Sequence, residues 1–295
     1  MNQIATAFWV DSFFKHLHCL MPSPSDPVAL PIAGLDIRWY ALFMLAGVIS
    51  GIWLTRVLAR RVGLDSNWVL DAAPWVVLFS ILGARVYYVL LRSDYFAAYP
   101  LEAVNIRLGG LSFHGALIAG TLGFALLCWC ARQPFLPWTD VAIPGVALAQ
   151  AVGRWGNWAN QEAFGTPTSA PWGLWIDPHQ RPPEFAEFER FHPTFFYESL
   201  FNLANAFILA WLALHVSESR RLRHGDVLAL YLINYGLARF LIERIRTDSL
   251  YLGPLPAAYW LSWGLFASGA ALLVYLRRSE RSGPVLPTSA QTHGH

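Results

Sequence analysis

Charged residues are scarce in this sequence of 295 residues: 14% are Asp, Glu, Lys or Arg, whereas 55% are hydrophobic. Ordinary soluble domains carry roughly 25% charged residues, so the composition excludes that class and predicts an integral membrane protein in a lipid bilayer. The 14 tryptophans and 11 tyrosines agree with this prediction, because amphipathic aromatic rings gather at the membrane interface. The formal net charge of +2 is small and spread along the chain, and it therefore does not indicate a nucleic-acid partner.

Cysteine and metal-ligand patterns are also lacking. Cys19, Cys128 and Cys130 have the spacing of neither a disulfide framework nor a zinc site. Cys128 and Cys130 lie in an apolar run, where the simplest interpretation is a small buried hydrophobic residue. No His, Asp or Glu residues have metal-ligand spacing in the segments of interest, so we expect no metal and no other cofactor.

The first 36 residues contain no uninterrupted signal-peptide core, because Asp11 and Lys15 break the first apolar stretch. We interpret residues 1–36 as an interfacial extension, in which Phe8 and Trp9 lie in the membrane surface on one face of a short helix. No repeat relates the two halves of the sequence, which argues against an inverted-repeat transporter.

Seven apolar segments reach or nearly reach the roughly 20 residues that cross a bilayer. The sequence therefore predicts an all-α membrane protein with seven transmembrane helices, in a membrane domain of residues 37–277. The only long loop, residues 160–193, is expected to form a small extracytoplasmic cap. The polar residues 278–295 are expected to be a disordered cytoplasmic tail. The predicted helices cover residues 38–56, 69–91, 111–131, 139–159, 194–216, 227–245 and 257–276.

The distribution of arginine between short loops predicts the orientation, since cytoplasmic loops carry an excess of Lys and Arg. With the N-terminus outside, the cytoplasmic side receives Arg60 and Arg61, then Arg220 and Arg221. The arginines on the opposite side are mostly interleaved with acidic residues. We therefore expect the N-terminus outside and the C-terminus in the cytoplasm.

The fourth apolar segment ends in an unusual concentration of polar residues. Arg154, Asn157 and Asn160 follow each other at spacings of three and can share one helix face, and Glu162 comes two residues later. An arginine at the centre of a membrane helix costs about 2.5–3.5 kcal/mol on insertion scales, so such residues usually mark a functional site. The sequence therefore predicts a polar site at the outer end of this helix.

Other polar residues fall at the same depth when position is counted at about 1.5 Å per residue. Tyr40 begins the first helix, Arg85 lies towards the outer end of the second, and His114 opens the third. Arg239 and Glu243 lie near the outer end of the sixth helix, where their i, i+4 spacing allows an ion pair. We expect the inner two thirds of the membrane to carry almost no polar side chains.

This one-sided distribution separates two classes of function. A channel or transporter needs a polar route through the whole membrane, whereas an enzyme that acts on a lipid headgroup needs a pocket at one leaflet. The distribution favours the enzyme, and arginines near one leaflet suit an anionic phosphate group. The alternative is a seven-helix transporter or lipid-binding receptor that uses the same pocket without bond chemistry.

Each candidate residue also has a structural interpretation. The Arg and Glu of the sixth helix could form a purely structural ion pair, and the two asparagines of the fourth could simply hold helices together by hydrogen bonds. His114 could be a satisfied core or interfacial histidine. For Arg85, which precedes Tyr87 and Tyr88, we favour an interfacial anchor. The coincidence of all these residues at one depth favours a shared site.

Residues Gly153–Gly165, with the sequence GRWGNWANQEAFG, closely resemble the signature of the prolipoprotein diacylglyceryl transferases, bacterial enzymes that lipidate lipoprotein precursors. Four shorter stretches agree with motifs of this family in order and spacing, and the match covers residues 37–277. Ala116 departs from the pattern, because the family usually has a second glycine there. The four stretches are Arg38–Tyr40, Ser112–Gly115, His192–Glu198 and Arg239–Arg246.

The resemblance implies a seven-helix protein of the bacterial inner membrane whose active site opens to the outer side. It implies two substrates, phosphatidylglycerol and the lipobox cysteine of a prolipoprotein signal peptide, and a reaction that forms a thioether and releases glycerol phosphate. His114, Arg154 and Arg239 are then the candidate catalytic residues. The candidate substrate-binding residues are Tyr40, Arg85, Asn157, Asn160, Glu162, Gly165, Glu243 and Arg246.

Ordinary pKa values suggest a mechanism for such a site. A cysteine thiol has a pKa of about 8.5 and a histidine one of about 6.5, so a neutral His114 could accept the thiol proton. Arg154 and Arg239 would stabilise the leaving phosphate by charge-assisted hydrogen bonds. Asn157 could donate to the same oxygens, Tyr40 could contact the headgroup or the peptide, and the Glu of the sixth helix would orient its arginine. Alternatively, His114 only positions the lipid, and the field of the arginines lowers the thiol pKa.

Overall fold

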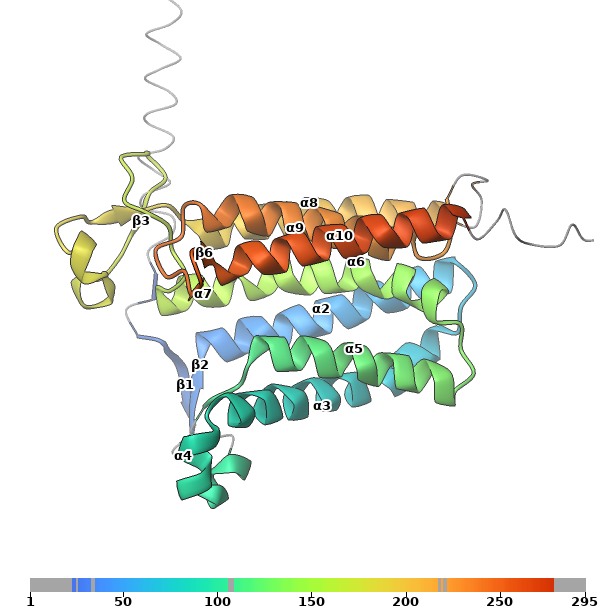
Figure 1. Cartoon of the computed structure of the whole chain (residues 1–295), viewed down its shortest axis with the longest axis horizontal. Coiled ribbons are helices and arrows are strands. Elements are labelled where there is room, and N and C mark those ends of the chain that lie inside the picture. Colours follow the sequence, from blue (N-terminus) through green and yellow to red (C-terminus); the bar gives the residue numbers. More distant parts are fainter. Residues whose placement is uncertain are drawn as a thin grey trace, which may run out of the picture.

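Long helices that run side by side dominate the computed structural model (Figure 1). The structure describes residues 23–24, 26–32, 35–105, 109–216, 219 and 222–278. The expected surface helix around Phe8 and Trp9 and the expected tail from residue 279 lie outside these residues. The long helices are α2 (Trp39–Arg61), α3 (Ser66–Leu91), α5 (Phe113–Cys130), α6 (Phe135–Gly153), α8 (Thr194–His215), α9 (Asp226–Glu243) and α10 (Ala257–Arg278), and the short α7 (Trp155–Asn160) continues α6.

Each of the seven predicted segments coincides with one of these helices, with differences at the ends. α2 continues to Arg61 rather than ending at residue 56. A helix can extend over arginine residues at its end, because their apolar stems pack along the helix while their charged groups reach water. α3 begins three residues earlier than predicted, because the Asp65 carboxylate accepts a hydrogen bond from Asn67 N–H at 2.9 Å and caps the helix. The fourth predicted helix begins at Phe135, directly after Pro134, and divides at Arg154 into α6 and α7.

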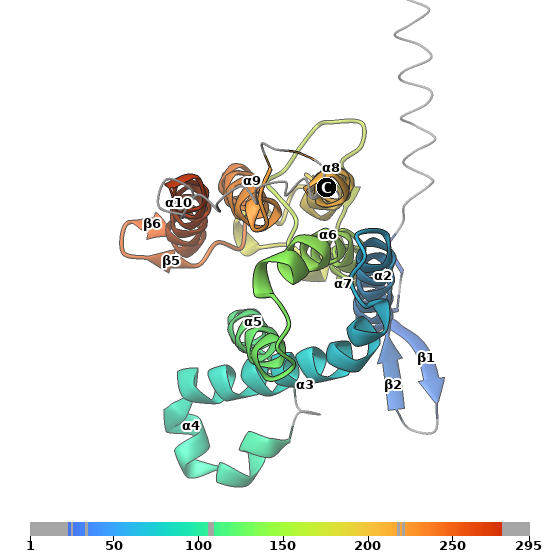
Figure 2. The same cartoon turned by 90° about the vertical axis from the view of Figure 1, so that its right-hand side faces the viewer.

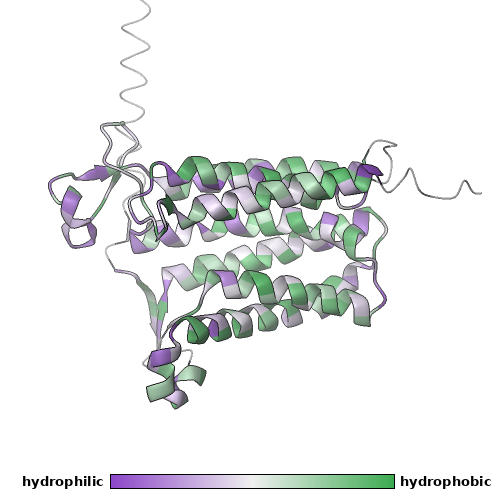
Figure 3. Cartoon of the chain, in the orientation of Figure 1, coloured by the Kyte–Doolittle hydropathy of each residue, from purple (hydrophilic) through white to green (hydrophobic). Residues whose placement is uncertain are grey.

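Six helices within the described residues are long and apolar enough to cross a membrane. They are α2, α3, α5, α6 with α7, α8 and α10, so the chain is a multi-pass membrane protein. The remaining long helix, α9, carries the charged residues Asp226, Arg239 and Glu243, and it packs between α8 and α10 (Figure 2). Hydrophobic residues cover most of each long helix, and hydrophilic residues gather towards the helix ends (Figure 3).

The short elements gather at one end of the bundle, which we call the cap end. Residues 161–193 form a cap with the antiparallel strands β3 (Leu174–Trp175) and β4 (Arg190–Phe191) and the short helices η3 (Pro178–Gln180) and η4 (Pro183–Phe185). The cap has its own core of Phe164, Leu174, Ile176, Phe191 and Phe195. Also at this end are β1 (Val28–Ile32) paired with β2 (Leu35–Arg38), α4 (Ser93–Ala98), η1 (Pro100–Val104), and β5 (Tyr251–Leu252) paired with β6 (Leu255–Pro256).

The opposite end, where α10 ends at Arg278, is the tail end, and a buried network joins its helices. Asp140 of α6 accepts hydrogen bonds from Gly225 N–H at 3.0 and 2.9 Å and lies 3.3 Å from His224 Nδ1. Asp226 of α9 accepts two hydrogen bonds from Arg277 of α10 at 2.9 and 2.8 Å, and a third from the backbone of residue 223 at 3.0 Å. Asp140, His224, Gly225, Asp226 and Arg277 are called the tail-end network below.

The expectation that the inner two thirds of the helices carry almost no polar side chains is wrong. Asn202 and Asn205 are buried halfway along α8, and Asp140 and Asp226 are buried at the tail end. Asp140 and Asp226 find their partners on other helices or loops, so a search for clustered polar residues along the sequence does not detect their pairing. The polar residues nevertheless do not form a continuous route, because an apolar cluster that includes Ala147, Leu209, Ala213 and Val227 separates the two sets.

Candidate active site at the cap end

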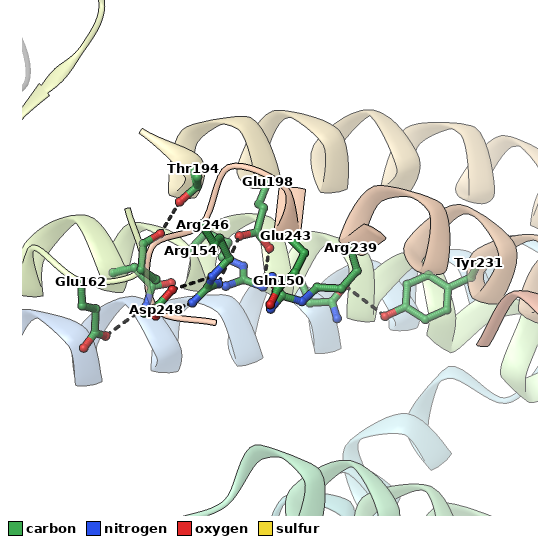
Figure 4. A network of polar contacts seen from close by, with 12 residues as sticks. Gln150, Arg154, Glu162, Thr194, Glu198, Tyr231, Arg239, Glu243, Arg246 and Asp248 are labelled. Atoms are coloured by element: carbon green, nitrogen blue, oxygen red, sulfur yellow. Dashed lines mark hydrogen bonds and ion pairs between the residues drawn. The ribbon is translucent and has the colours of Figure 1, made fainter. Parts of the chain in front are cut away.

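Glu198, the residue at the centre of the candidate site, lies between two arginines from different parts of the chain (Figure 4). Its Oε2 atom is 2.5 Å from Arg154 Nη2, at the junction of α6 and α7, and its Oε1 atom is 3.9 Å from Arg246 Nη1. Arg246 in turn donates two hydrogen bonds to Asp248, at 2.8 and 2.6 Å. Glu198 is only 7% exposed, so this carboxylate fixes both guanidinium groups inside the protein.

Arg239 and Glu243 form the ion pair predicted from their spacing on α9, with 2.6 Å between Arg239 Nη2 and Glu243 Oε2. Among the buried atoms of the site without a hydrogen-bond partner in the described part of the chain are Arg239 Nη1 and Glu198 Oε1. An unpaired buried polar atom is unfavourable, and in native structures it usually marks a bound water, ion or ligand. We call Arg154, Glu198, Arg239, Glu243, Arg246 and Asp248 the cap-end cluster.

Burial lowers the pKa of Arg246, and the hydrogen bond to Asp248 raises it, together with the charges of Glu198 and Glu243. The net effect raises the pKa above its ordinary value, so Arg246 is positively charged at any pH in which the protein works. The acidic residues around it therefore hold a permanent cation in a fixed orientation.

Glu162 is held by the two asparagines of the signature segment. Asn157 Nδ2 donates to Glu162 Oε1 at 3.0 Å, and Asn160 Nδ2 donates to the same oxygen at 3.3 Å. Tyr40 of α2 packs directly on α7, since a Cβ atom on Gly156 would lie 2.8 Å from its ring. The helix face predicted to carry Arg154, Asn157 and Asn160 together therefore divides. The asparagines orient Glu162, whereas Arg154 binds Glu198.

Glycine is needed at position 165 because three backbone segments approach one another closely there. Gly165 N–H donates to His192 O at 2.9 Å, Thr166 N–H donates to Ile245 O at 2.6 Å, and Gly165 also pairs with Arg246 as an isolated β-bridge. A Cβ atom on Gly165 would lie 2.8 Å from both Ile245 O and the Cβ of His192. Glycine at this position therefore allows the end of the signature segment to hold the backbone that carries Arg246.

A further set of polar side chains lies on α6, α8 and α9, further from the cap. Tyr231 donates to Gln150 at 3.0 Å, and Asn234 donates to Asn205 at 3.0 Å. Sequence reasoning missed these residues and did not count Glu198 among the site residues. A signal was present, because Glu198, Asn202 and Asn205 share one face of α8 at spacings of four and three.

Arg85 lies apart from the cap-end cluster and has a different set of partners. Its guanidinium donates five hydrogen bonds to backbone carbonyls of the loop between α3 and α5, at distances from 2.5 to 3.1 Å. Arg85 is 7% exposed, and its guanidinium also lies 5.3 Å from the Phe96 ring. Because all five donors are used by the protein, Arg85 orders this loop.

His114 is exposed at the first turn of α5, where its ring lies 6.3 Å from that of Tyr87. In the part of the chain that the structure describes, no hydrogen bond or ion pair joins His114 to the arginines. Figure 2 shows α5 on the opposite side of the bundle from α8 and α9. No group of His, Cys, Asp and Glu side chains among the described residues could hold a metal ion.

Comparison with known proteins identifies relatives over most of the chain. A family model described as prolipoprotein diacylglyceryl transferase matches residues 27–275. A phosphatidylglycerol–prolipoprotein diacylglyceryl transferase from Synechococcus elongatus is 43% identical over 259 residues, which cover 88% of this chain and 90% of the relative. Proteins of the same name from a Nostoc species and from Finegoldia magna are 40% and 37% identical, and cover 93% and 86% of this chain and 97% and 96% of their own lengths.

Proposed function

Because the chain belongs to the prolipoprotein diacylglyceryl transferase family, we propose that the cap-end cluster transfers the diacylglyceryl group of phosphatidylglycerol to the lipobox cysteine of a prolipoprotein signal peptide. The transfer of this group to prolipoproteins is the first step of bacterial lipoprotein maturation. The thiol sulfur forms a bond to the glycerol carbon that bears the phosphate, and the carbon–oxygen bond to the phosphate breaks. The products are a thioether on the peptide and glycerol phosphate, and the thiol proton passes to a base.

The observation that carries this assignment is two half-buried arginines, Arg154 and Arg239, whose side chains are 23% and 16% exposed. Arg239 Nη1 has no partner among the described residues, and the ion pair of Arg154 with Glu198 uses only the Nη2 atom of Arg154. Glu198 and Glu243 fix one edge of each guanidinium, so the remaining N–H groups are preorganised for the oxygens of a phosphate ester. Such donors stabilise the charge that develops on a leaving phosphate without reorganising during the reaction.

The other site residues support the two substrates. Asn157 and Asn160 hold Glu162 in place, and we assign these three residues and Tyr40 to contacts with the glycerol headgroup or the peptide. Gly165 keeps Arg246 in register. Arg85 is left out of the substrate site because its five donors are already used.

We further propose that α9 is a seventh transmembrane crossing. Its neighbours α8 and α10 are both long and apolar enough to span the membrane. Its charges have partners inside the bundle, since Asp226 pairs with Arg277 and Arg239 pairs with Glu243, and paired charges are tolerated within a bundle. With seven crossings and arginine-rich loops at the tail end, we propose that the cap lies outside the bacterial inner membrane and the end of α10 lies in the cytoplasm.

His114 is the proposed general base, and this role requires the substrates to bind between α5 and the arginines. Because general-base catalysis contributes about 10²–10⁴-fold, we expect His114→Gln to lower kcat by a factor in this range and to remove the titration of a histidine from the pH–rate profile. His179→Gln, in the exposed η3 helix of the cap, is the matched control and should leave both unchanged. Near-normal turnover of His114→Gln would instead assign the histidine to lipid positioning.

The reaction is tested with purified protein in detergent, phosphatidylglycerol and a synthetic lipobox peptide. The expected result is a diacylglyceryl gain in the peptide mass with an equal amount of glycerol phosphate, lost in Arg239→Ala and with a peptide in which Ser replaces the lipobox Cys. Arg244→Ala is the control variant, because Arg244 follows the same helix and instead lies 5.3 Å from the Phe240 ring. No mass gain from folded protein that binds the lipid would refute the proposal in favour of binding or transport.

A further inference from the structure

A cavity of about 240 Å³ lies between α2, α3, α5 and α6, away from the cap-end cluster. Its walls are aliphatic and aromatic, with residues such as Ile52, Val76 and Ala142. The Thr55 hydroxyl in the wall donates to Gly51 O at 2.9 Å, and Trp138 Nε1 donates to Gln133 at 3.0 Å. These polar atoms are therefore satisfied within the protein, and an apolar occupant suits the space better than water.

Measured along the axis of α6, the cavity lies below the level of Arg154. Its lining begins at Ala149, five residues before Arg154 and about 7.5 Å below it at 1.5 Å per residue, and ends at Trp138, about 16 Å further on. One leaflet contributes about 15 Å to a hydrocarbon core of about 30 Å. Arg154 is itself recessed, six residues or about 9 Å below the end of α7 at Asn160. A lipid whose phosphate binds Arg154 is therefore drawn inwards, and the length from Ala149 to Trp138 matches one acyl chain.

An aromatic floor closes the cavity near the tail end. The rings of Trp68 and Trp138 lie 4.4 Å apart, and Phe124 lies 6.1 Å from Trp68. Phe135 lies 5.8 Å from Phe124 and supports it from outside the cavity. Trp138 is 1% exposed, whereas Trp68 and Phe124 are half-buried, so Trp138 is the most tightly packed part of this floor and resists a longer occupant most.

We propose that the cavity binds one acyl chain of the donor lipid and that the floor of Trp68, Phe124 and Trp138 limits the length of that chain. This inference rests on the proposed function, because it takes the phosphate of the same lipid to bind Arg154. Selectivity follows from the packing: a chain that ends above the floor leaves apolar surface unfilled, whereas a longer chain must bend out of the cavity. Each methylene that no longer fits is expected to change relative kcat/KM about fourfold, which corresponds to about 0.8 kcal/mol per buried methylene.

The experiment supplies wild-type protein with lipobox peptide and an equimolar mixture of phosphatidylglycerols that differ in one acyl chain: lauroyl, myristoyl, palmitoyl or stearoyl. The mass of the lipidated peptide reports which chains were transferred. Ala142→Phe places a ring one helical turn above Trp138 and should shift the products towards shorter chains. Trp68→Leu lowers the floor and should shift them towards longer chains.

Leu70→Phe, on an exposed position of α3 that does not line the cavity, is the matched control and should give the wild-type distribution. The two active variants are expected to move in opposite directions, so a folding defect in one leaves the other as a test. An unchanged distribution in both, with turnover retained, would overturn the proposal and leave the cavity to bilayer lipid. An equal loss for every chain length in Ala142→Phe would also overturn it and assign the space to the apolar segment of the peptide. Absence of any lipidation by wild-type protein would refute the proposed function itself.

Discussion

The two ends of the helix bundle each bury a set of charged residues, but the sets differ in how completely their atoms are paired. In the tail-end network, both oxygens of Asp226 accept from Arg277, and both oxygens of Asp140 accept from Gly225 N–H. In the cap-end cluster, Arg239 Nη1 and Glu198 Oε1 have no hydrogen-bond partner among the described residues. Glu198 and Glu243 are buried at the cap end, as Asp140 and Asp226 are at the tail end, so burial alone does not distinguish the two sets.

This difference in pairing separates a structural site from a ligand site. A buried carboxylate whose hydrogen bonds are complete has no capacity left for another molecule, and it fixes the elements around it. A buried guanidinium with an unused donor is unfavourable in the absence of a partner, so its presence indicates that a partner binds there. The cap-end cluster is therefore expected to control activity, and the tail-end network is expected to control stability.

Arg154→Lys at the cap end is expected to have the largest effect on activity. Lysine keeps the charge but cannot present two parallel donors to a phosphate or to Glu198, so kcat/KM should fall about 10²–10³-fold, as when a preorganised oxyanion donor is removed. Steady-state lipidation of the peptide measures the change, and the thermal unfolding midpoint should stay close to that of the wild type. Near-normal activity would refute the bidentate role.

Glu198→Gln tests whether a carboxylate must hold the two arginines in place. Glutamine is nearly the same size but has no negative charge for Arg154 or Arg246, so both guanidinium groups should lose orientation. We expect kcat to fall about tenfold to a hundredfold, as for groups that orient the residues directly in contact with substrate. Glu198→Asp should restore part of the activity. Equal activity of the Gln and wild-type proteins would show that Glu198 has no positioning role.

Arg277→Ala tests the opposite side of the comparison. It leaves Asp226 buried without its two charged donors, and hydrogen bonds to charged groups contribute about 1.5–3 kcal/mol. Because the Arg277 side chain is partly exposed, we expect the free energy of unfolding to fall by about 2 kcal/mol, while turnover per folded molecule stays within about twofold. Arg278→Ala, at the next position of α10, is the control. A loss of turnover without a loss of stability would contradict the division between the two ends.

The smallest effect is expected from His224→Ala. Its Nδ1 atom lies 3.3 Å from Asp140, but the His224 side chain is half exposed and Gly225 N–H remains bound to the same carboxylate. Exposed ion pairs contribute about 0–1 kcal/mol, so the unfolding free energy should change by less than about 1 kcal/mol. Denaturation of the two proteins in parallel measures it, and a change as large as that of Arg277→Ala would mean that His224 is a principal member of the network.

The order and extent of the long helices were predicted from the sequence with small errors. A run of about 20 apolar residues in a membrane forms a helix, because a helix satisfies every backbone hydrogen bond within the segment. The i, i+4 pair of Arg239 and Glu243 was equally accessible, since one helix fixes their relation. Local geometry was sufficient for each of these predictions.

The sequence by itself therefore determined the membrane class, the long helices, the resemblance to one transferase family and the ion pair within α9. Only the tertiary structure decided that Glu198 joins Arg154 to Arg246, that Arg85 orders a loop, and that an aromatic floor closes the cavity. The physical reason is the range of the interactions. Helix formation and pairs within one helix depend on residues within a few positions, whereas the partners of Glu198 lie 44 and 48 positions away and meet only when the helices pack.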